Sequence, residues 1–168
     1  RRGDFTVNIA LVEGGKPTRG VVYAPAKGRM FYTQADGQSV EETGALDKDA
    51  IGDVIPMRVS DSNNDALLVV ASKSHRDQAT DDYINKYAVK DMKSAGSSLK
   101  FCLVATGEAD LYPRLGRTME WDTAAAQCVV EQAGGVVQDI GGNRLGYNKP
   151  VLRNPSIITL GEASFIWR

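Results

Sequence analysis

The sequence has little of what several common kinds of site require. It contains one histidine and two cysteines in 168 residues, which argues against a zinc site built from several His or Cys ligands. Cys102 and Cys128 each lie in an apolar stretch with helical spacing, as expected of buried, reduced thiols. The sequence has no apolar run long enough to cross a bilayer, and residues 1–5 lack the apolar segment of a signal peptide. We therefore expect no integral membrane segment and a cytoplasmic location.

The chain also lacks an excess of either charge. Its 20 Lys and Arg residues nearly balance 21 Asp and Glu residues, so nothing indicates broad electrostatic binding to a nucleic acid polymer or an anionic membrane. With 42% hydrophobic and 24% charged residues, the composition is typical of a globular domain. The length is compatible with one complete core or with part of a larger fold. Any anionic ligand must be bound by a few local cations.

The first part of the chain reads as a meander of antiparallel strands. Apolar and β-branched residues at 5–12, 20–23, 29–33 and near Val40 alternate with Gly-rich and Pro-containing turns, a pattern that predicts hairpins. Residues 41–64 read as a loop with a short strand at 57–59. No helix in this part would cover one face of the sheet, so we expect the cover upstream of Arg1, and self-association where it is missing. We assign residues 1–60 to the sheet portion of an incomplete amino-terminal domain.

Strands and helices alternate in the remainder of the chain. Residues 66–71 form a continuous apolar run, typical of a strand buried on both faces, and helical patterns follow at 77–87 and 97–106. Further strands are expected at 109–112, 135–139 and 156–159. We predict an α/β, or layered α+β, architecture in which an antiparallel meander precedes a mixed sheet covered by helices. Residues 61–168 are assigned to a carboxy-terminal α/β domain that binds substrate.

The helix expected after Gly116 carries the carboxylate around which the site is predicted. Ala125, Val129 and Ala133 repeat at helical spacing and predict a narrow buried face, and glycines at 134–135 mark its end. Asp122 falls in the first turn of this helix, where a carboxylate can serve simply as a cap. The position by itself favours the cap. A role of Asp122 as a metal ligand is implied only by the resemblance given below.

Three further segments carry candidate ligands for an anion. Ser72 and His75 directly follow the buried strand, where α/β sheets bind ligands, although a polar residue there can merely cap the next helix. Ser97 and Lys100 lie in a small-residue turn that opens a helix, which suits an anion as well as it suits an ordinary cap. Arg114 ends a short strand and is either a phosphate ligand or an exposed arginine.

Taken together and in order, six segments resemble the bacterial 3′(2′),5′-bisphosphate nucleotidases of the inositol-monophosphatase-like phosphatases. They are Thr6-Val-Asn-Ile-Ala-Leu11, Gly20-Val-Val-Tyr-Ala-Pro25, Ser72-Lys-Ser-His75, Gly96-Ser-Ser-Leu-Lys-Phe101, Leu111-Tyr-Pro-Arg114 and Trp121-Asp-Thr-Ala-Ala125. The resemblance implies the carboxy-terminal part of an αβαβα sandwich and an Mg²⁺-dependent phosphatase. Its expected substrate is adenosine 3′,5′-bisphosphate, a by-product of sulfate activation, or the sulfated form of that nucleotide.

The same resemblance assigns roles to individual residues. Substrate contacts would fall on Ser72, His75, Ser97, Lys100, Arg114 and Asp122, with Asp122 also a metal ligand. In the family, the other metal ligands and the catalytic groups belong to a Glu-Glu segment and an Asp-Pro-Ile/Leu-Asp-Gly-Thr loop, which would lie upstream of Arg1. We therefore expect the 168-residue chain to be a fragment that is inactive by itself. The resemblance also leaves open a peripheral position at the inner membrane.

Two other functions remain open at this point. One is an inositol- or sugar-phosphate phosphatase of the same superfamily, against which the segments around Ser72 and Ser97 argue. The other is a non-catalytic module that binds a nucleotide. The sequence leaves undetermined the number of metal ions, the oligomeric state and the reason why the upstream motifs are absent.

Overall fold

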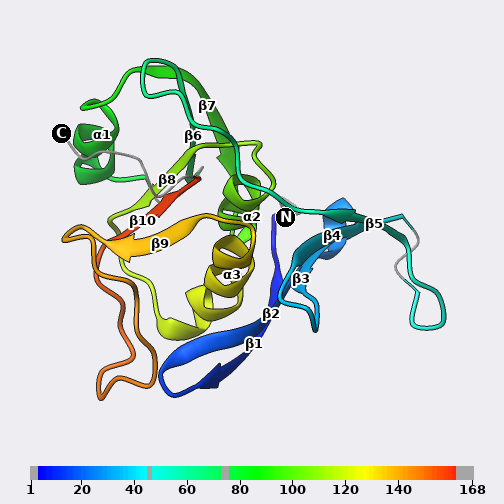
Figure 1. The fold of residues 1–168 in the computed structure, drawn as a ribbon. Coiled ribbons are helices and arrows are strands. Elements are labelled where there is room, and N and C mark those ends of the chain that lie inside the picture. The colour runs from blue at the N-terminus through cyan, green and yellow to red at the C-terminus, as the bar shows by residue number, and fades with distance from the viewer. Residues whose placement is uncertain (1–3, 45–46, 73–75, 162–168) are drawn as a thin grey trace.

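Two five-stranded sheets with helices between them form the protein (Figure 1). The structure is a computed structural model that describes residues 4–44, 47–72 and 76–161. Helices α2 (Leu99–Ala105) and α3 (Glu120–Gln132) lie between the two sheets, and α1 (Gln78–Ile84) lies on the outer face of the second sheet. The layers therefore run sheet, helices, sheet, helix, which confirms the predicted α/β layering. No helix in the described ranges is long and apolar enough to cross a bilayer.

The first sheet is an antiparallel meander with the strand order β1-β2-β3-β4-β5. Its strands are β1 (Val7–Glu13), β2 (Lys16–Ala24), β3 (Arg29–Thr33), β4 (Ser39–Thr43) and β5 (Asp53–Pro56). Gly14 and Gly15 both have positive φ, at 56° and 75°, as a two-residue hairpin turn requires. A short 3-10 helix, Pro25–Lys27, joins β2 to β3 and ends at Gly28 in the left-handed conformation.

The second sheet is mixed, with the strand order β7-β6-β8-β10-β9. Its strands are β6 (Leu67–Ser72), β7 (Val89–Ala95), β8 (Leu111–Arg114), β9 (Val136–Asp139) and β10 (Ile157–Leu160). β6 runs parallel to β7 and β8, whereas β10 runs antiparallel to β8 and β9. β6 is buried on both faces: Val70 packs toward α2 and α3, and Val69 packs in the cluster that contains Ile84 of α1.

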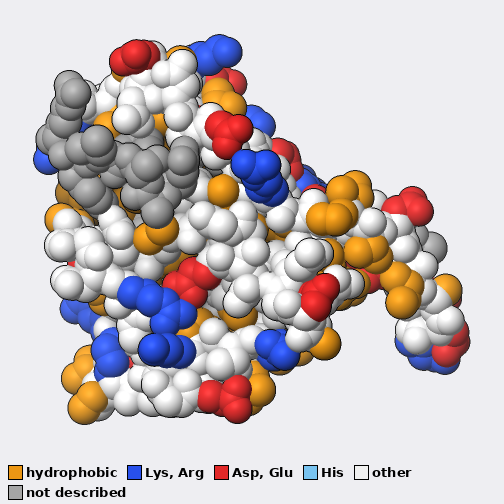
Figure 2. All heavy atoms as spheres, in the orientation of Figure 1, with side chains coloured by type: hydrophobic (Ala, Val, Ile, Leu, Met, Phe, Trp, Pro, Cys, Tyr) orange, Lys and Arg blue, Asp and Glu red, His pale blue; other side chains and the backbone are white. Residues whose placement is uncertain are grey.

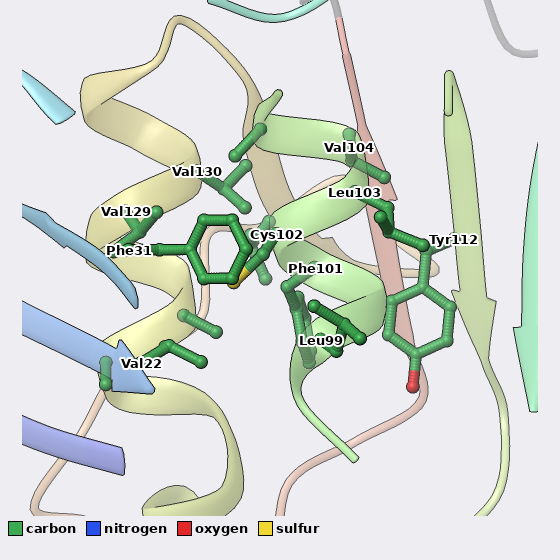
Figure 3. Close-up of a cluster of buried hydrophobic side chains, with 14 of the residues drawn as sticks. Val22, Phe31, Leu99, Phe101, Cys102, Leu103, Val104, Tyr112, Val129 and Val130 are labelled. Atoms are coloured by element: carbon green, nitrogen blue, oxygen red, sulfur yellow. The ribbon is translucent and has the colours of Figure 1, made fainter. Parts of the chain in front are cut away.

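One hydrophobic core joins the first sheet to the second. Phe31 of β3 packs with Cys102 of α2 and Val129 of α3 (Figure 3), and the same cluster reaches Ile157 in β10. Both cysteines are free and buried, as predicted. The sheets divide the chain between Pro56 and Leu67. The assignment of two separate domains, 1–60 and 61–168, stays a prediction.

Four details of the sequence prediction are wrong. The strand expected at 57–59 lies instead at Asp53–Pro56, and strand β7 was missed. The helix expected over 77–87 is confined to Gln78–Ile84, capped by the Asp77 side chain. The inner face of the first sheet does have a cover within the chain, because α3 packs on it through Ala125 and Val129.

The outer face of the first sheet, by contrast, is open in the part of the chain that the structure describes. Val7, Ile9 and Leu11 of β1 are 46%, 64% and 52% exposed. Figure 2 shows hydrophobic side chains gathered over the β4–β5 end of the same sheet, where Val54 and Ile55 are exposed.

Candidate functional site

A hollow of about 330 Å³ lies where the carboxyl ends of β6 and β8 meet the amino ends of α2 and α3. Ser72 is the last residue of β6 and Arg114 the last of β8, so two parallel strands deliver them to the same edge of the sheet. Of the residues predicted for substrate binding, the hollow brings together Ser72, Ser97, Lys100, Arg114 and Asp122. His75 lies outside the described residues.

Asp122 is the third residue of α3, and its carboxylate is exposed at the rim of the hollow. Its Oδ2 accepts a hydrogen bond from the Met119 amide at 2.8 Å, and the Asp122 amide donates to the Met119 carbonyl at 2.9 Å. The carboxylate therefore does cap the helix, as the simpler interpretation predicted. No residue that the structure describes donates to the other oxygen, Oδ1, which can bind a cation.

Lys100 is the buried cation of the site. Its side chain rises from α2 with only 4% of the residue exposed, and Nζ donates to the carbonyls of Ser97 at 2.8 Å and Ala95 at 3.4 Å. Nζ also lies 5.4 Å from the centroid of the Tyr112 ring. Burial, together with the positive charge of Arg114, lowers the pKa of Lys100 to about 8. The ammonium therefore titrates close to neutral pH.

The turn before α2 is held by side chains from the first sheet. Ser97 has a positive φ of 51°, unusual for a residue with a side chain. The Thr6 hydroxyl lies 2.6 Å from Ser97 Oγ and 2.7 Å from Ser98 Oγ, and Ser98 Oγ donates to Asn8 Oδ1 at 2.5 Å. Sequence reasoning did not assign roles to Thr6 and Asn8. Their only signal was membership in the Thr6-Val-Asn segment.

Arg114 and Arg117 supply two more cations to the hollow. Arg114 Nη2 donates to the Arg117 carbonyl at 3.3 Å, which ties the loop between β8 and α3 to the end of the strand. Arg114 also contributes to the repulsion that lowers the Lys100 pKa. The hollow thus combines three cations with two carboxylates, Asp4 and Asp122.

A polar network behind α3 fixes its first turn. Glu120 accepts hydrogen bonds from the Asn148 amide at 2.8 Å and from Lys149 Nζ at 2.6 Å. Burial opposes ionisation of Glu120, but the bonds from Lys149 and Asn148 hold its pKa below the usual range. Asn154 Nδ2 donates to the hydroxyls of Thr118 and Thr123 at 3.2 and 3.0 Å. These contacts join residues about thirty positions apart in the chain, and sequence reasoning missed them.

The residues of the hollow fit part of a site for a hard divalent cation. Such a cation takes oxygen ligands, carboxylates above all. Asp122 Oδ1 is one oxygen available as a ligand. Asp4 also lines the hollow, although its carboxylate pairs with Lys27 at 3.4 Å. Within residues 4–44, 47–72 and 76–161, no group of three or more His, Cys, Asp or Glu side chains is placed to hold a metal. These described residues supply a minority of the ligands that Mg²⁺ needs.

Known proteins resemble this chain in sequence and in structure. It is 44% identical over 147 residues to the 3′(2′),5′-bisphosphate nucleotidase CysQ of Salmonella typhimurium, and 45% identical over 148 residues to CysQ of Escherichia coli strain K12. Each alignment covers 88% of this chain and 56% of the relative, so the chain spans little more than half the length of these relatives.

The solved structures resemble it in the same way. The crystal structure of CysQ from Bacteroides thetaiotaomicron, described as a bacterial member of the inositol monophosphatase family, superposes with a TM-score of 0.85 at 36% identity. That superposition covers 96% of this chain and 64% of the other. An inositol monophosphatase from Anabaena shares the fold, with a TM-score of 0.71 at 23% identity. The sequence profile of the inositol monophosphatase family matches residues 1–162, and the chain belongs to that family.

Proposed function

We propose that the hollow binds adenosine 3′,5′-bisphosphate and that, with Mg²⁺, this chain takes part in removing the 3′-phosphate to give AMP. The observation that carries the proposal is the meeting of Lys100, Arg114 and Asp122 at the carboxyl ends of two parallel strands. The names of the CysQ relatives support the choice of substrate. The sulfated form of the nucleotide is a second candidate substrate.

Each residue has a distinct part in this proposal. The Ser97 and Ala95 carbonyls hold the ammonium of Lys100, a residue that lines the hollow, and its remaining N–H would bind a phosphate oxygen. Arg114 can bind phosphate through two N–H groups at once. Ser72, His75 and Ser97 would contact the rest of the nucleotide.

Asp122 would hold the metal through Oδ1 while Oδ2 keeps the helix capped. Bound Mg²⁺ would supply neutralisation of the reacting phosphoryl group and a more acidic water. Because the described residues offer few carboxylates at the hollow, we expect the chain by itself to bind the nucleotide without turning it over. Binding is therefore the property to measure.

A phosphatase for inositol or sugar phosphates is the alternative, and the Anabaena structure shares its fold. The number of cations in the hollow favours the nucleotide, because a substrate with one phosphate has less charge to match. A module that binds the nucleotide without catalysis also remains open. Cytoplasmic location stays a prediction.

Calorimetric titration of the chain tests the proposal. Adenosine 3′,5′-bisphosphate should bind more tightly than inositol 1-phosphate. Lys100→Ala and Arg114→Ala should each lower the affinity for the nucleotide by roughly ten- to a hundredfold, because each removes one charge-assisted contact. Equal affinity for both ligands would favour the inositol phosphatase. Unchanged affinity in both variants would remove the hollow as the binding site.

A further inference from the structure

Glu120 and Asp122 belong to the same turn of α3 but face different sides of it. Successive residues of a helix are about 100° apart around its axis, so residues two positions apart lie on roughly opposite faces. Asp122 lines the hollow of the proposed function, whereas Glu120 does not line it and has 9% of its side chain exposed. Glu120 can therefore influence the hollow only through the backbone of the helix.

The carboxylate of Glu120 holds the loop between β9 and β10. Oε2 accepts a hydrogen bond from the Asn148 amide at 2.8 Å, and Oε1 accepts one from the Lys149 amide at 3.1 Å. Asn148 has a positive φ of 61°, a conformation that can turn consecutive amides toward one anion. Lys149 Nζ donates a further bond to Oε1 at 2.6 Å. Three donors from one short segment thus converge on a single buried side chain.

The same loop also pairs with the backbone at the start of α3. The Glu120 amide donates to the Leu152 carbonyl at 2.9 Å, and the Asn154 amide donates to the Thr118 carbonyl at 2.9 Å. Asn154, which is 5% exposed, donates through Nδ2 to the Thr118 hydroxyl as well. Thr118 is itself a residue of the hollow. Residues 148–154 therefore form a brace that is bound to the start of α3 by backbone and side-chain bonds.

The brace affects the direction of the Asp122 carboxylate. Among the described residues, that exposed carboxylate is held by one hydrogen bond, from the Met119 amide at 2.8 Å. One bond orients a side chain only where its donor is held in place. Met119 directly precedes Glu120 and forms a backbone bridge with Arg153 of the brace. The brace therefore fixes the donor on which the direction of Asp122 depends.

We propose that Glu120 is a positioning residue: through the brace it holds the Met119 amide against Asp122 Oδ2, and so presents Oδ1 to a cation in the hollow. The inference rests on the proposed function, because it takes Asp122 to be a ligand of Mg²⁺. Glu120 itself touches neither the nucleotide nor the cation. Removing a group that orients a metal ligand commonly lowers metal affinity by roughly ten- to a hundredfold.

Calorimetry with adenosine 3′,5′-bisphosphate at a series of Mg²⁺ concentrations tests this role. Glu120→Gln keeps the size of the side chain but replaces one accepting oxygen by an NH₂ group, which weakens its hold on the brace. The Mg²⁺ concentration that gives half the gain in nucleotide affinity should rise roughly tenfold. The affinity without Mg²⁺ should change by less than about threefold, because Lys100 and Arg114 belong to other elements.

Glu131→Gln is the matched control. Glu131 belongs to the same helix and accepts two bonds from Arg144, at 2.7 and 2.5 Å, but it lies near the other end of α3. Its substitution should leave the required Mg²⁺ concentration unchanged. Amide hydrogen exchange without metal gives a second measurement: the Met119 amide should lose protection in Glu120→Gln and keep it in Glu131→Gln.

An unchanged Mg²⁺ requirement in Glu120→Gln would overturn the inference, and so would an equal loss of affinity with and without Mg²⁺, which indicates a purely structural role. In either case, weaker binding by Lys100→Ala would leave the proposed function standing. If the parent chain gained no affinity from Mg²⁺, the metal role of Asp122 and this inference would fall together. If circular dichroism showed Glu120→Gln to be unfolded, Lys149→Met should raise the Mg²⁺ requirement and Lys149→Arg should restore it, and equal values for these two variants would contradict the inference.

Discussion

The Met119 amide donates to Oδ2 of Asp122 at 2.8 Å and leaves Oδ1 without a donor among the described residues. One carboxylate can therefore cap helix α3 and still offer an oxygen to a metal. The two interpretations of Asp122 that the sequence left open are compatible. The cap should affect the stability of the chain, whereas the metal ligand should affect its response to Mg²⁺, so substitutions of Asp122 can separate the two roles.

Asp122→Asn and Asp122→Ala separate the cap from the metal ligand. Asparagine keeps an oxygen for the Met119 amide, so its cost should be the lost charge at the helix end, about 0.3–1 kcal/mol. Alanine also removes the capping hydrogen bond and should lower the free energy of unfolding by a further amount of about 0.5–2 kcal/mol. Denaturant unfolding measures both. The increase in nucleotide affinity on adding Mg²⁺ should disappear equally in the two variants, and a normal Mg²⁺ response in Asp122→Asn would leave Asp122 as a cap only.

Lys100 should make the stability of the chain depend on pH in the alkaline range. Its pKa is lowered to about 8 by burial and by Arg114, below that of the unfolded chain, so the unfolded state binds more protons between these two values and stability rises with pH. Lys100→Met has no titrating group at this position. Relative to that variant, the free energy of unfolding of the parent chain should rise by about 2 kcal/mol between about pH 7 and pH 9.5.

Urea unfolding of both chains at several pH values measures this difference. A constant gap between them would show that the buried ammonium keeps an ordinary pKa. Because the proposed phosphate contact needs the charged form, affinity for the nucleotide should fall as the pH rises through about 8. That loss should be absent from Lys100→Met.

Gly20 should be intolerant of any side chain. A Cβ there would overlap the Ala125 carbonyl of α3, which lies against β2. Gly20→Ala must push the helix and sheet apart, at a cost of about 1–3 kcal/mol. Gly146→Ala is the matched control, because a Cβ there meets nothing within 4 Å and φ is not positive. Equal unfolding midpoints for the two variants would contradict the close packing of α3 on the first sheet.

The exposed outer face of the first sheet should make the chain self-associate. Ile9 lies in β1, at the edge of the sheet within the described residues, with 64% exposure, and contiguous exposed apolar side chains favour association. Sedimentation velocity should show concentration-dependent oligomers that Ile9→Lys reduces. Val151→Lys, at a residue 68% exposed in the loop between β9 and β10, should not. A parent chain that stays monomeric at high concentration would exclude this face as a contact.

Local patterns predicted most of the elements. Alternation and turn chemistry located β1 to β3, and Gly134, with φ of 96°, ends α3 as expected. Strand β7 was missed because its sequence, Val89–Ala95, is polar and lacks alternation, as an edge strand can. Its pairing with β6 is a tertiary contact that no local pattern reports.

The site was predicted through the resemblance more than through local physics. Lys100 read equally well as a solvated lysine, and only the fold shows it buried over Tyr112. The contacts of Thr6 with the Ser97 turn span 91 residues, and Arg117 had no motif to mark it. Side chains brought together by topology have no signature in the spacing of the sequence.

The most direct test of the account is to map where the nucleotide binds. In an amide NMR titration with adenosine 3′,5′-bisphosphate, the largest shifts should fall on Ser97, Ser98, Lys100, Arg114 and Arg117, which line one hollow. The amide resonances of residues on the exposed outer face of β1 should not shift. Shifts that cluster elsewhere, or a spectrum unchanged at saturating nucleotide, would contradict the claim that this hollow is a nucleotide site.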